Sequence, residues 1–89
     1  MTTIWKYTIE KDKRFQIVKM PESAEILDLQ YQNDQLAIWA YVGDTDAPVI
    51  EVGILMYGTG WEIKEDLTDA TFLKTIQDDN GLVWHFFMT

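Results

Sequence analysis

The sequence predicts a small all-β domain of about seven short, mainly antiparallel strands. Short runs alternate apolar and polar side chains with a period of two, and they are rich in β-branched and aromatic residues. Turn-forming clusters separate these runs, and no stretch shows the period of a convincing amphipathic helix. Such a pattern is typical of a compact sandwich or a partly open barrel. We therefore expect a single β domain over residues 1–89, with at most one short helical turn.

The first two strands are predicted on either side of a polar tripeptide. Residues 3–10 alternate, and three apolar side chains share one face: Trp5, Tyr7 and Ile9. Lys11-Asp12-Lys13 can close a hairpin into a second strand over residues 14–20. Pro21 cannot donate to a sheet ladder, so this strand is expected to end there.

The next two strands are predicted around an Asn-Asp turn. Over residues 25–32 the alternation places Leu27, Leu29 and Tyr31 on one face and Ile26, Asp28 and Gln30 on the other. Asn33 and Asp34 suit a turn because both residue types tolerate left-handed backbone geometry. Residues 36–42 are apolar on both faces, which predicts a strand in the middle of a sheet with both sides covered, or with one side forming an interface.

The C-terminal half continues with a loop, a long strand and a hairpin. Residues 43–48 read as a loop and residues 49–57 as a strand, in which Gly53 indicates a bulge or a close neighbour. Residues 64–70 are polar and suit a loop or one helical turn. Strands over residues 72–77 and 82–88 flank Asp78-Asp79-Asn80-Gly81, and Asn-Gly between apolar runs strongly favours a hairpin.

Charge and composition narrow the class of partner. The net charge of −8 argues against duplex nucleic acid, because such binding neutralises many phosphates with Lys and Arg. The first twenty residues nevertheless carry a balance of +3, against −11 for the rest. The basic segment could hold a small anion with one or two phosphates, or it could simply be a solvated hairpin.

The absence of cysteine indicates where the protein works. Small secreted domains usually depend on disulfides, so a chain without cysteine favours a reducing cytoplasm. No apolar run approaches the roughly 20 residues that span a bilayer, and the N-terminus lacks the features of a signal peptide. We expect a cytoplasmic protein that does not associate with a membrane.

The residue inventory is poor in catalytic groups. The single histidine, His85, and the single serine, Ser23, would have to meet an acid to form a triad, and no nucleophile-elbow pattern surrounds Ser23. One histidine does not make a zinc site, and the loop carboxylates do not match a calcium-loop spacing. We expect no enzyme, no metal and no cofactor, and we expect His85 to be a strand residue bonded to its surroundings.

Binding suits the inventory better than catalysis does. The chain has four Trp, four Tyr and four Phe, a surplus that predicts rings at a ligand site or a subunit interface. Tyr57-Gly58-Thr59-Gly60 follows the longest apolar strand. Its two glycines could open the backbone to phosphate or sugar oxygens, or they could only punctuate the end of the strand.

Several short pieces together carry a resemblance. These are Trp5-Lys6, Met20-Pro21 followed by Ala24, Tyr57-Gly58-Thr59-Gly60, and Val83-Trp84-His85. In this order and spacing the chain resembles a family of small bacteriophage proteins, long of unassigned function. It is also similar to anti-CBASS sponge proteins, small oligomers that sequester cyclic dinucleotide signals and so silence host immunity. Trp61 departs from that family's pattern, which more often has His at this position.

The resemblance implies a ligand, an assembly and a site. The ligand would be a 3′,3′-linked cyclic dinucleotide such as cyclic GMP-AMP, bound without cleavage in the inter-subunit pockets of a homo-oligomer, with a tetramer favoured, in the host bacterial cytoplasm. The expected contacts are backbone groups of Gly58, Thr59 and Gly60, stacking on Trp5 and Trp84, and phosphate charge from Lys6 or Arg14. Two alternatives stay open: an acidic inhibitor that covers a basic site on a host enzyme, and a small phosphodiesterase.

Overall fold

The computed structural model describes all of residues 1–89 and forms seven strands and no helix. The strands are β1 (Thr3–Ile9), β2 (Phe15–Pro21), β3 (Ala24–Gln32), β4 (Gln35–Val42), β5 (Val49–Gly58), β6 (Thr71–Gln77) and β7 (Val83–Met88). The all-β prediction is thus confirmed, and the segment before β6 forms turns without a helical one. The structure contains no helix that could cross a membrane.

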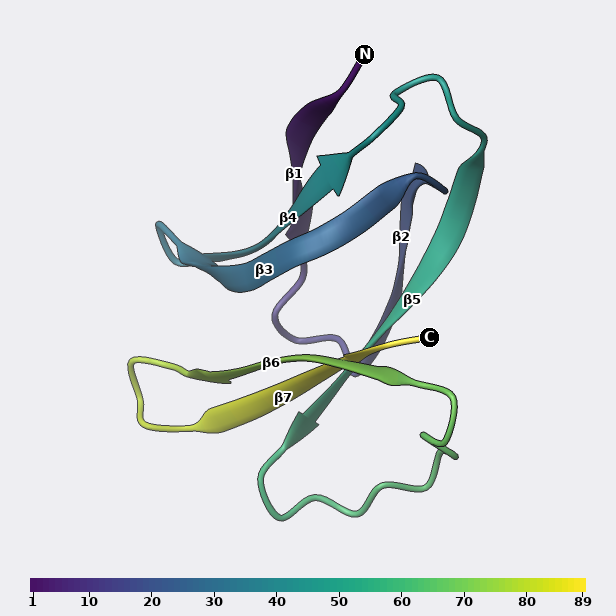
Figure 1. Cartoon of the computed structure of the whole chain (residues 1–89). Helices are drawn as coiled ribbons and strands as arrows, with labels where there is room; N and C mark the ends of the chain where they lie inside the picture. The colour runs from purple at the N-terminus through teal and green to yellow at the C-terminus, as the bar shows by residue number, and fades with distance from the viewer.

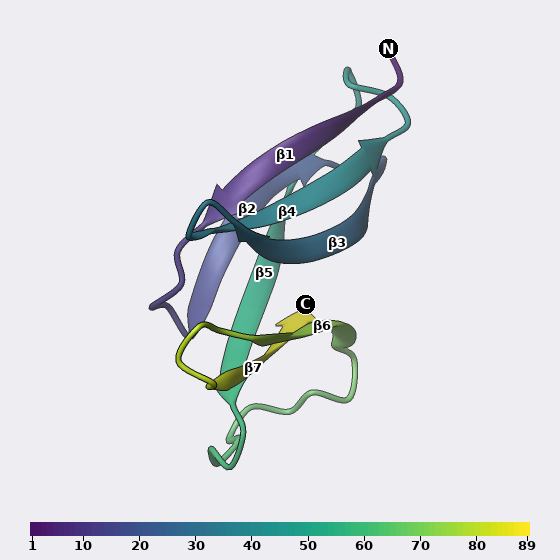
Figure 2. The same ribbon diagram turned by 90° about the vertical axis from the view of Figure 1, so that its left-hand side faces the viewer.

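The strands form two antiparallel sheets packed against each other. One sheet has three strands in the order β1-β4-β3, and the other has four in the order β2-β5-β7-β6. Figures 1 and 2 show the three-stranded sheet above the β6–β7 hairpin, with the long strand β5 running past both. The sequence is compatible with a sandwich or a partly open barrel, and the structure is a sandwich of two sheets.

The core lies between the sheets and is formed largely by their inner strands, β4 in one sheet and β5 and β7 in the other. Leu36 and Ile38 of β4 and Ile54 of β5 are at most 1% exposed, as is Phe86 of β7. Burial of one such side chain stabilises the fold by about 1.5–3 kcal/mol. The apolar run of residues 36–42 does form the central strand of its sheet, as predicted.

The hairpin predicted between the first two strands is wrong. β1 pairs with β4 and β2 pairs with β5, so residues 10–14 carry the chain from one sheet to the other. Both strands have an apolar face, Ile9 being buried in β1 and Val18 in β2. Two such faces bury more surface when they oppose each other across the core than when they lie side by side in one sheet.

The alternation predicted for residues 25–32 breaks at a bulge. The β3–β4 register shifts between Ile26 and Asp28, which leaves Leu27 without a cross-strand partner. Ile26 therefore packs against the core together with Leu29, whereas Leu27 is 53% exposed. A one-residue bulge reverses the faces on one side of it, and a period-two pattern does not reveal where that happens.

The predicted turns form where the sequence places them. Asn33 and Asp34 have φ values of 51° and 65°, the left-handed pair of a tight hairpin between β3 and β4. Gly81, with φ of 79°, turns the chain between β6 and β7. At Gly53, β5 has no bulge but has close neighbours, because a Cβ atom there would lie 2.9 Å from Cε1 of Phe15.

Candidate functional site

The seven predicted site residues lie in three separate places. Gly58 ends β5 and Thr59 and Gly60 form the turn after it, while Arg14 precedes β2 beside the end of β5. Trp84 is the cross-strand partner of Gly58 on β7, but its side chain lies on the face of the sheet opposite to that of His85. Trp5 and Lys6 belong to β1 in the other sheet. The predicted site is therefore not a single pocket within one chain.

Glycine is needed at positions 58 and 60 for two different structural reasons. A Cβ atom on Gly58 would lie 2.7 Å from Nε1 of Trp61, so the missing side chain leaves room for the indole ring. Gly60 has φ of 89° with open space where a Cβ atom would be, so its backbone geometry requires glycine. Only Gly60 therefore offers open backbone to a ligand, because the Thr59 N–H already donates to the Val83 carbonyl at 3.2 Å.

The outward face of the four-stranded sheet carries two neighbouring cross-strand rows. The first row is apolar and follows the register across all four strands: Phe15, Leu55, Phe87 and Phe72. The second row lies two residues away along β5 and β7, at about 7 Å, and continues to Thr75 past the β6 bulge and to Arg14 just before β2; it is polar at its ends: Arg14, Tyr57, His85 and Thr75. Phe15 is 52% and Phe72 is 55% exposed, and the Phe72 and Phe87 rings meet edge to face at 5.6 Å.

His85 is held between two hydroxyl groups. The Thr59 hydroxyl lies 2.7 Å from Nε2, and the Thr75 hydroxyl lies 2.9 Å from Nδ1. A neutral imidazole has one donor and one acceptor nitrogen, so one threonine accepts a hydrogen bond and the other donates one. The expectation that His85 is a strand residue bonded to its surroundings is confirmed. We call Arg14, Thr59, Gly60, Thr75 and His85 the His85 surface.

Arg14 is the only cationic residue of the His85 surface, and its guanidinium is already paired with Glu65. Its guanidinium lies over the Tyr57 ring, 5.9 Å from the centroid, and hydrogen-bonds the Glu65 carboxylate. That hydrogen bond holds the pKa of Glu65 below its ordinary value. Burial, followed by the Glu65 charge, raises the pKa of Tyr57. Tyr57 is 2% exposed, and its hydroxyl is buried without a hydrogen-bond partner.

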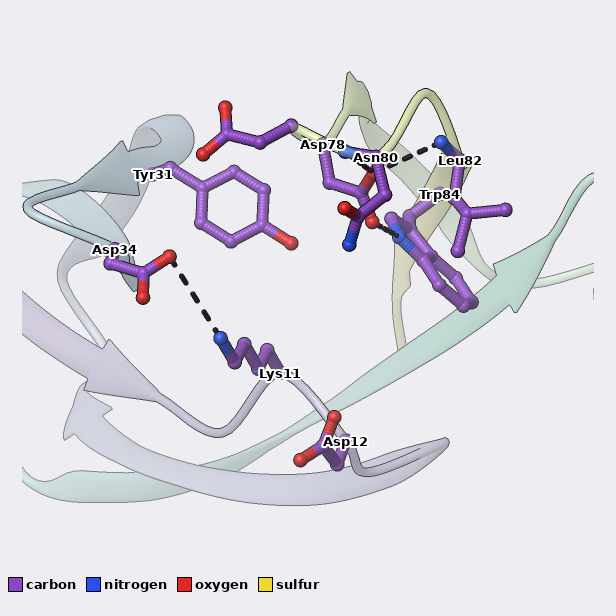
Figure 3. Close-up of a pocket in the computed structure, with 9 residues that line it drawn as sticks. Lys11, Asp12, Tyr31, Asp34, Asp78, Asn80, Leu82 and Trp84 are labelled. Carbon is purple, nitrogen blue, oxygen red and sulfur yellow. Dashed lines mark hydrogen bonds and ion pairs between the residues drawn. The ribbon is translucent and has the colours of Figure 1, made fainter.

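Trp84 lines a different feature, an acidic pocket of about 510 Å³ between the two sheets. Figure 3 shows Tyr31 from the end of β3, Lys11 and Asp12 from the connection after β1, and the β6–β7 turn converging on it. Four carboxylates line the pocket against one cation: Asp12, Asp34, Asp78 and Asp79, with Lys11. Lys11 Nζ lies 3.9 Å from Asp34. A phosphate group beside Trp84 would therefore face repulsion.

Asp78 organises the rim of the acidic pocket. Its Oδ2 accepts a hydrogen bond from Trp84 Nε1 at 3.0 Å, and its Oδ1 accepts from the backbone N–H groups of Asn80 and Leu82, each at 2.9 Å. The Trp84 hydrogen bond is the main cause that lowers the pKa of Asp78. The Trp61 ring meets the Trp84 ring edge to face at 5.4 Å. Trp84 is thus fixed by its neighbours at both its polar and its apolar parts.

Trp5 and Lys6 occupy opposite faces of β1. Trp5 is 38% exposed and lies on the core-side face with Ile9. Lys6 Nζ donates to Oε1 of Gln32 at 2.6 Å across the outward face of the three-stranded sheet. The structure brings neither residue to the Gly58-Thr59-Gly60 motif.

The sequence predicts Arg14, Thr59 and Gly60 of the His85 surface as site residues, but not Thr75, a site role for His85 or the adjacent apolar row. His85 was assigned to a strand, but Thr75, Phe87 and Phe72 were not linked to it. The two-residue alternation in β7 does indicate that His85 and Phe87 share a face of that strand. The bulge in β6 between Phe72 and Lys74 concealed the matching face on the partner strand.

Comparison with known proteins places the whole chain in one family. Neither a search of curated proteins nor a search of solved structures found a match. A family model described as a domain of unknown function, DUF7352, matches residues 1–89. The chain therefore belongs to the DUF7352 family.

Proposed function

We propose that this protein binds a cyclic dinucleotide signal, such as 3′,3′-cyclic GMP-AMP, and sequesters it without cleavage, as a bacteriophage protein that evades host immunity. The observation that carries the proposal is the pair of adjacent rows on the four-stranded sheet. One row offers exposed aromatic rings, and the other offers a guanidinium, hydroxyls and an imidazole. The resemblance to anti-CBASS sponge proteins supports the same ligand class.

The two rows match the two parts of a nucleotide. Nucleobases would stack on Phe15 and Phe72, each about half exposed, and stacking of a base on an aromatic ring contributes about 1–3 kcal/mol. Phosphate and sugar oxygens would meet Arg14, the Thr59 hydroxyl and the open backbone of Gly60. A planar guanidinium suits phosphate because it can donate two parallel hydrogen bonds.

The geometry at His85 favours binding over hydrolysis. A serine-type or threonine-type nucleophile requires a histidine base whose second nitrogen is oriented by a third group, usually a carboxylate. The second nitrogen of His85 is bonded to the Thr75 hydroxyl instead. This arrangement supports sequestration and weighs against the phosphodiesterase alternative.

A homo-oligomer, with a tetramer favoured, is part of the proposal. The apolar row leaves Phe15 and Phe72 half exposed on one face, where a second copy would enclose a flat ligand. Trp5 and Lys6 lie in the other sheet, so they would reach the nucleotide only as residues supplied by another copy. An inter-subunit pocket would therefore account for Trp5 and Lys6 but not for Trp84, which is held against Asp78.

Incubation with a panel of cyclic di- and trinucleotides tests the proposal. The protein is separated from free nucleotide and then heat-denatured, and the released molecule is identified by mass spectrometry. We expect an intact 3′,3′-linked cyclic dinucleotide from the parent protein and from Lys13→Gln, a control with the same charge change on an exposed lysine. Arg14→Gln should release much less. No binding across the panel at tens of micromolar protein would overturn the proposal.

The acidic pocket favours a second candidate function, an inhibitor that covers a basic site on a host enzyme. Its four carboxylates surround two aromatic rings, those of Tyr31 and Trp84, a combination that suits an Arg or Lys side chain. Asp34→Lys and Asp79→Lys should each prevent capture of a stoichiometric partner from a bacterial lysate and leave nucleotide release unchanged. Failure of the parent protein to capture any stoichiometric partner would count against this function.

A further inference from the structure

Two β-bulges, one in each sheet, lie beside the same cavity. The first lies at Leu27 in β3 and the second at Leu73 in β6. A cavity of about 500 Å³ opens between these strands and reaches the core, and both bulged residues line it. We call it the bulge cleft. Bulges commonly lie next to binding sites because they redirect side chains and interrupt pairing.

The bulge cleft has the size and lining of a small-molecule site. Ten of its fifteen lining residues are hydrophobic. Leu27, Ile50 and Phe72 at its mouth are 53%, 42% and 55% exposed, whereas Leu29 at its base is 1% exposed. A volume of 500 Å³ lies within the range of about 300–1,000 Å³ that is usual for ligand pockets.

The charges at the bulge cleft specify the sign of its ligand. Three acidic residues line it, Glu25, Asp28 and Glu51, and no basic residue does. Lys74 lies at its edge but is paired with Asp28, with Nζ 2.8 Å from Oδ1. Lys19 lies opposite Glu51 in the β2–β5 register. The remaining potential favours a cation and disfavours an anion.

We propose that the bulge cleft binds a small molecule with an apolar, aromatic body and a positively charged amine. The apolar body would enter between Leu27 and Phe72 toward the core, and the amine would remain at the mouth near Glu25 and Glu51. This site shares Phe72 with the proposed nucleotide site, but the cleft and the charges that support it are separate observations, so it does not depend on the proposed nucleotide function.

A matched set of probes tests the proposal on the full chain. N-phenyl-1-naphthylamine is neutral and fluoresces in apolar sites, and 8-anilino-1-naphthalenesulfonate adds a negative charge to the same body. We expect the neutral dye to bind and the sulfonate to bind at least about tenfold more weakly. We also expect 4-phenylbutylamine to displace the neutral dye at concentrations at least about tenfold lower than 4-phenylbutyrate.

Variants locate the binding. Leu27→Gln should lower the affinity for the neutral dye severalfold. Ile4→Gln changes a residue in β1 that is 57% exposed, and it should leave that affinity unchanged. Glu25→Gln combined with Glu51→Gln should remove the preference for the amine while leaving the neutral dye bound, and Glu62→Gln should not. The proposal is overturned if the dye does not bind, if Leu27→Gln and Ile4→Gln behave alike, or if amine and carboxylate displace it equally.

Discussion

The hydroxyl of Thr59 lies 2.7 Å from Nε2 of His85, which joins the turn after β5 to the middle of β7. The same ring is held at Nδ1 by Thr75 of β6, 2.9 Å away. Residues from two strands and one turn therefore share one hydrogen-bonded chain on the outward face of the sheet. This chain fixes the only histidine beside the apolar row of Phe15, Leu55, Phe87 and Phe72.

Removal of either hydroxyl should weaken nucleotide binding. Thr59→Val and Thr75→Val keep the β-branched shape but break the chain through His85. We expect each to cost about 1.5 kcal/mol, or roughly tenfold in affinity, the effect of losing one hydrogen bond in a site that holds a charged ligand. Isothermal titration measures it, and Thr8→Val, on an exposed position of β1, is the control. Equal affinity of all three variants and the parent would show that the hydrogen bonds between Thr59, His85 and Thr75 play no part in ligand binding.

A methyl group at Gly58 should destabilise the fold by displacing Trp61. A Cβ atom there would lie 2.7 Å from Nε1 of Trp61. We expect Gly58→Ala to lower the free energy of unfolding by about 1–3 kcal/mol, which is typical of overpacking. The double variant Gly58→Ala/Trp61→Ala should show a smaller cost than the sum of the two single variants, because the clash is gone. Additive costs in urea unfolding would mean that the ring does not need the glycine.

Acid should destabilise the protein through Asp28. The hydrogen bond from Lys74 is the main cause that lowers the pKa of Asp28 in the folded protein, and a carboxylate of this kind favours the fold while it is ionised. This stabilisation is present above the unfolded-state pKa of about 3.9 and is lost as the pH falls through the lower folded-state value.

Urea unfolding between about pH 5 and pH 2 tests this effect. Asp28→Asn and Lys74→Met should both flatten the loss of unfolding free energy with falling pH, since each removes the pair. A slope as steep as that of the parent protein in both variants would contradict this account of Asp28.

Truncation of a core residue should destabilise the fold far more than truncation of a residue on the outward face of the same sheet. Ile38 is 0% exposed at the centre of β4, whereas Ile4 is 57% exposed on the outward face of β1. We expect Ile38→Ala to cost about 2–5 kcal/mol and Ile4→Ala to stay within about 0.5 kcal/mol. Chemical denaturation measures both values. A similar cost at the two positions would mean that Ile4 is covered in solution, as it would be in an oligomer.

Local sequence signals predicted the strands, the turns and the β6–β7 hairpin, but not how strands distant in the sequence pair. The Asn33-Asp34 and Asn80-Gly81 turns form because short-range backbone chemistry decides them. The pairing of β1 with β4 instead of β2 depends on which apolar faces meet across the core, a long-range choice. Leu27 was placed on the wrong face because the bulge leaves no mark on a period-two pattern.

The candidate site could be predicted only in part. The Tyr-Gly-Thr-Gly motif drew attention to Thr59, but its grouping with His85 and Thr75 follows from the β5-β7-β6 order, which is not visible in the sequence. The resemblance implies stacking on Trp84. The structure holds its indole against Asp78, on the face opposite to His85.

The equilibrium affinity for 3′,3′-cyclic GMP-AMP of three proteins tests the central claim most directly: the parent, Arg14→Gln and Glu65→Gln. Glu65 occupies the guanidinium of Arg14, so a phosphate has to compete with it. We expect Arg14→Gln to weaken binding by about 10- to 100-fold, the loss of a charge-assisted hydrogen bond, and Glu65→Gln to tighten it. Opposite shifts would support the site on the His85 surface. Unchanged affinity in both variants, or no binding by the parent protein, would contradict it.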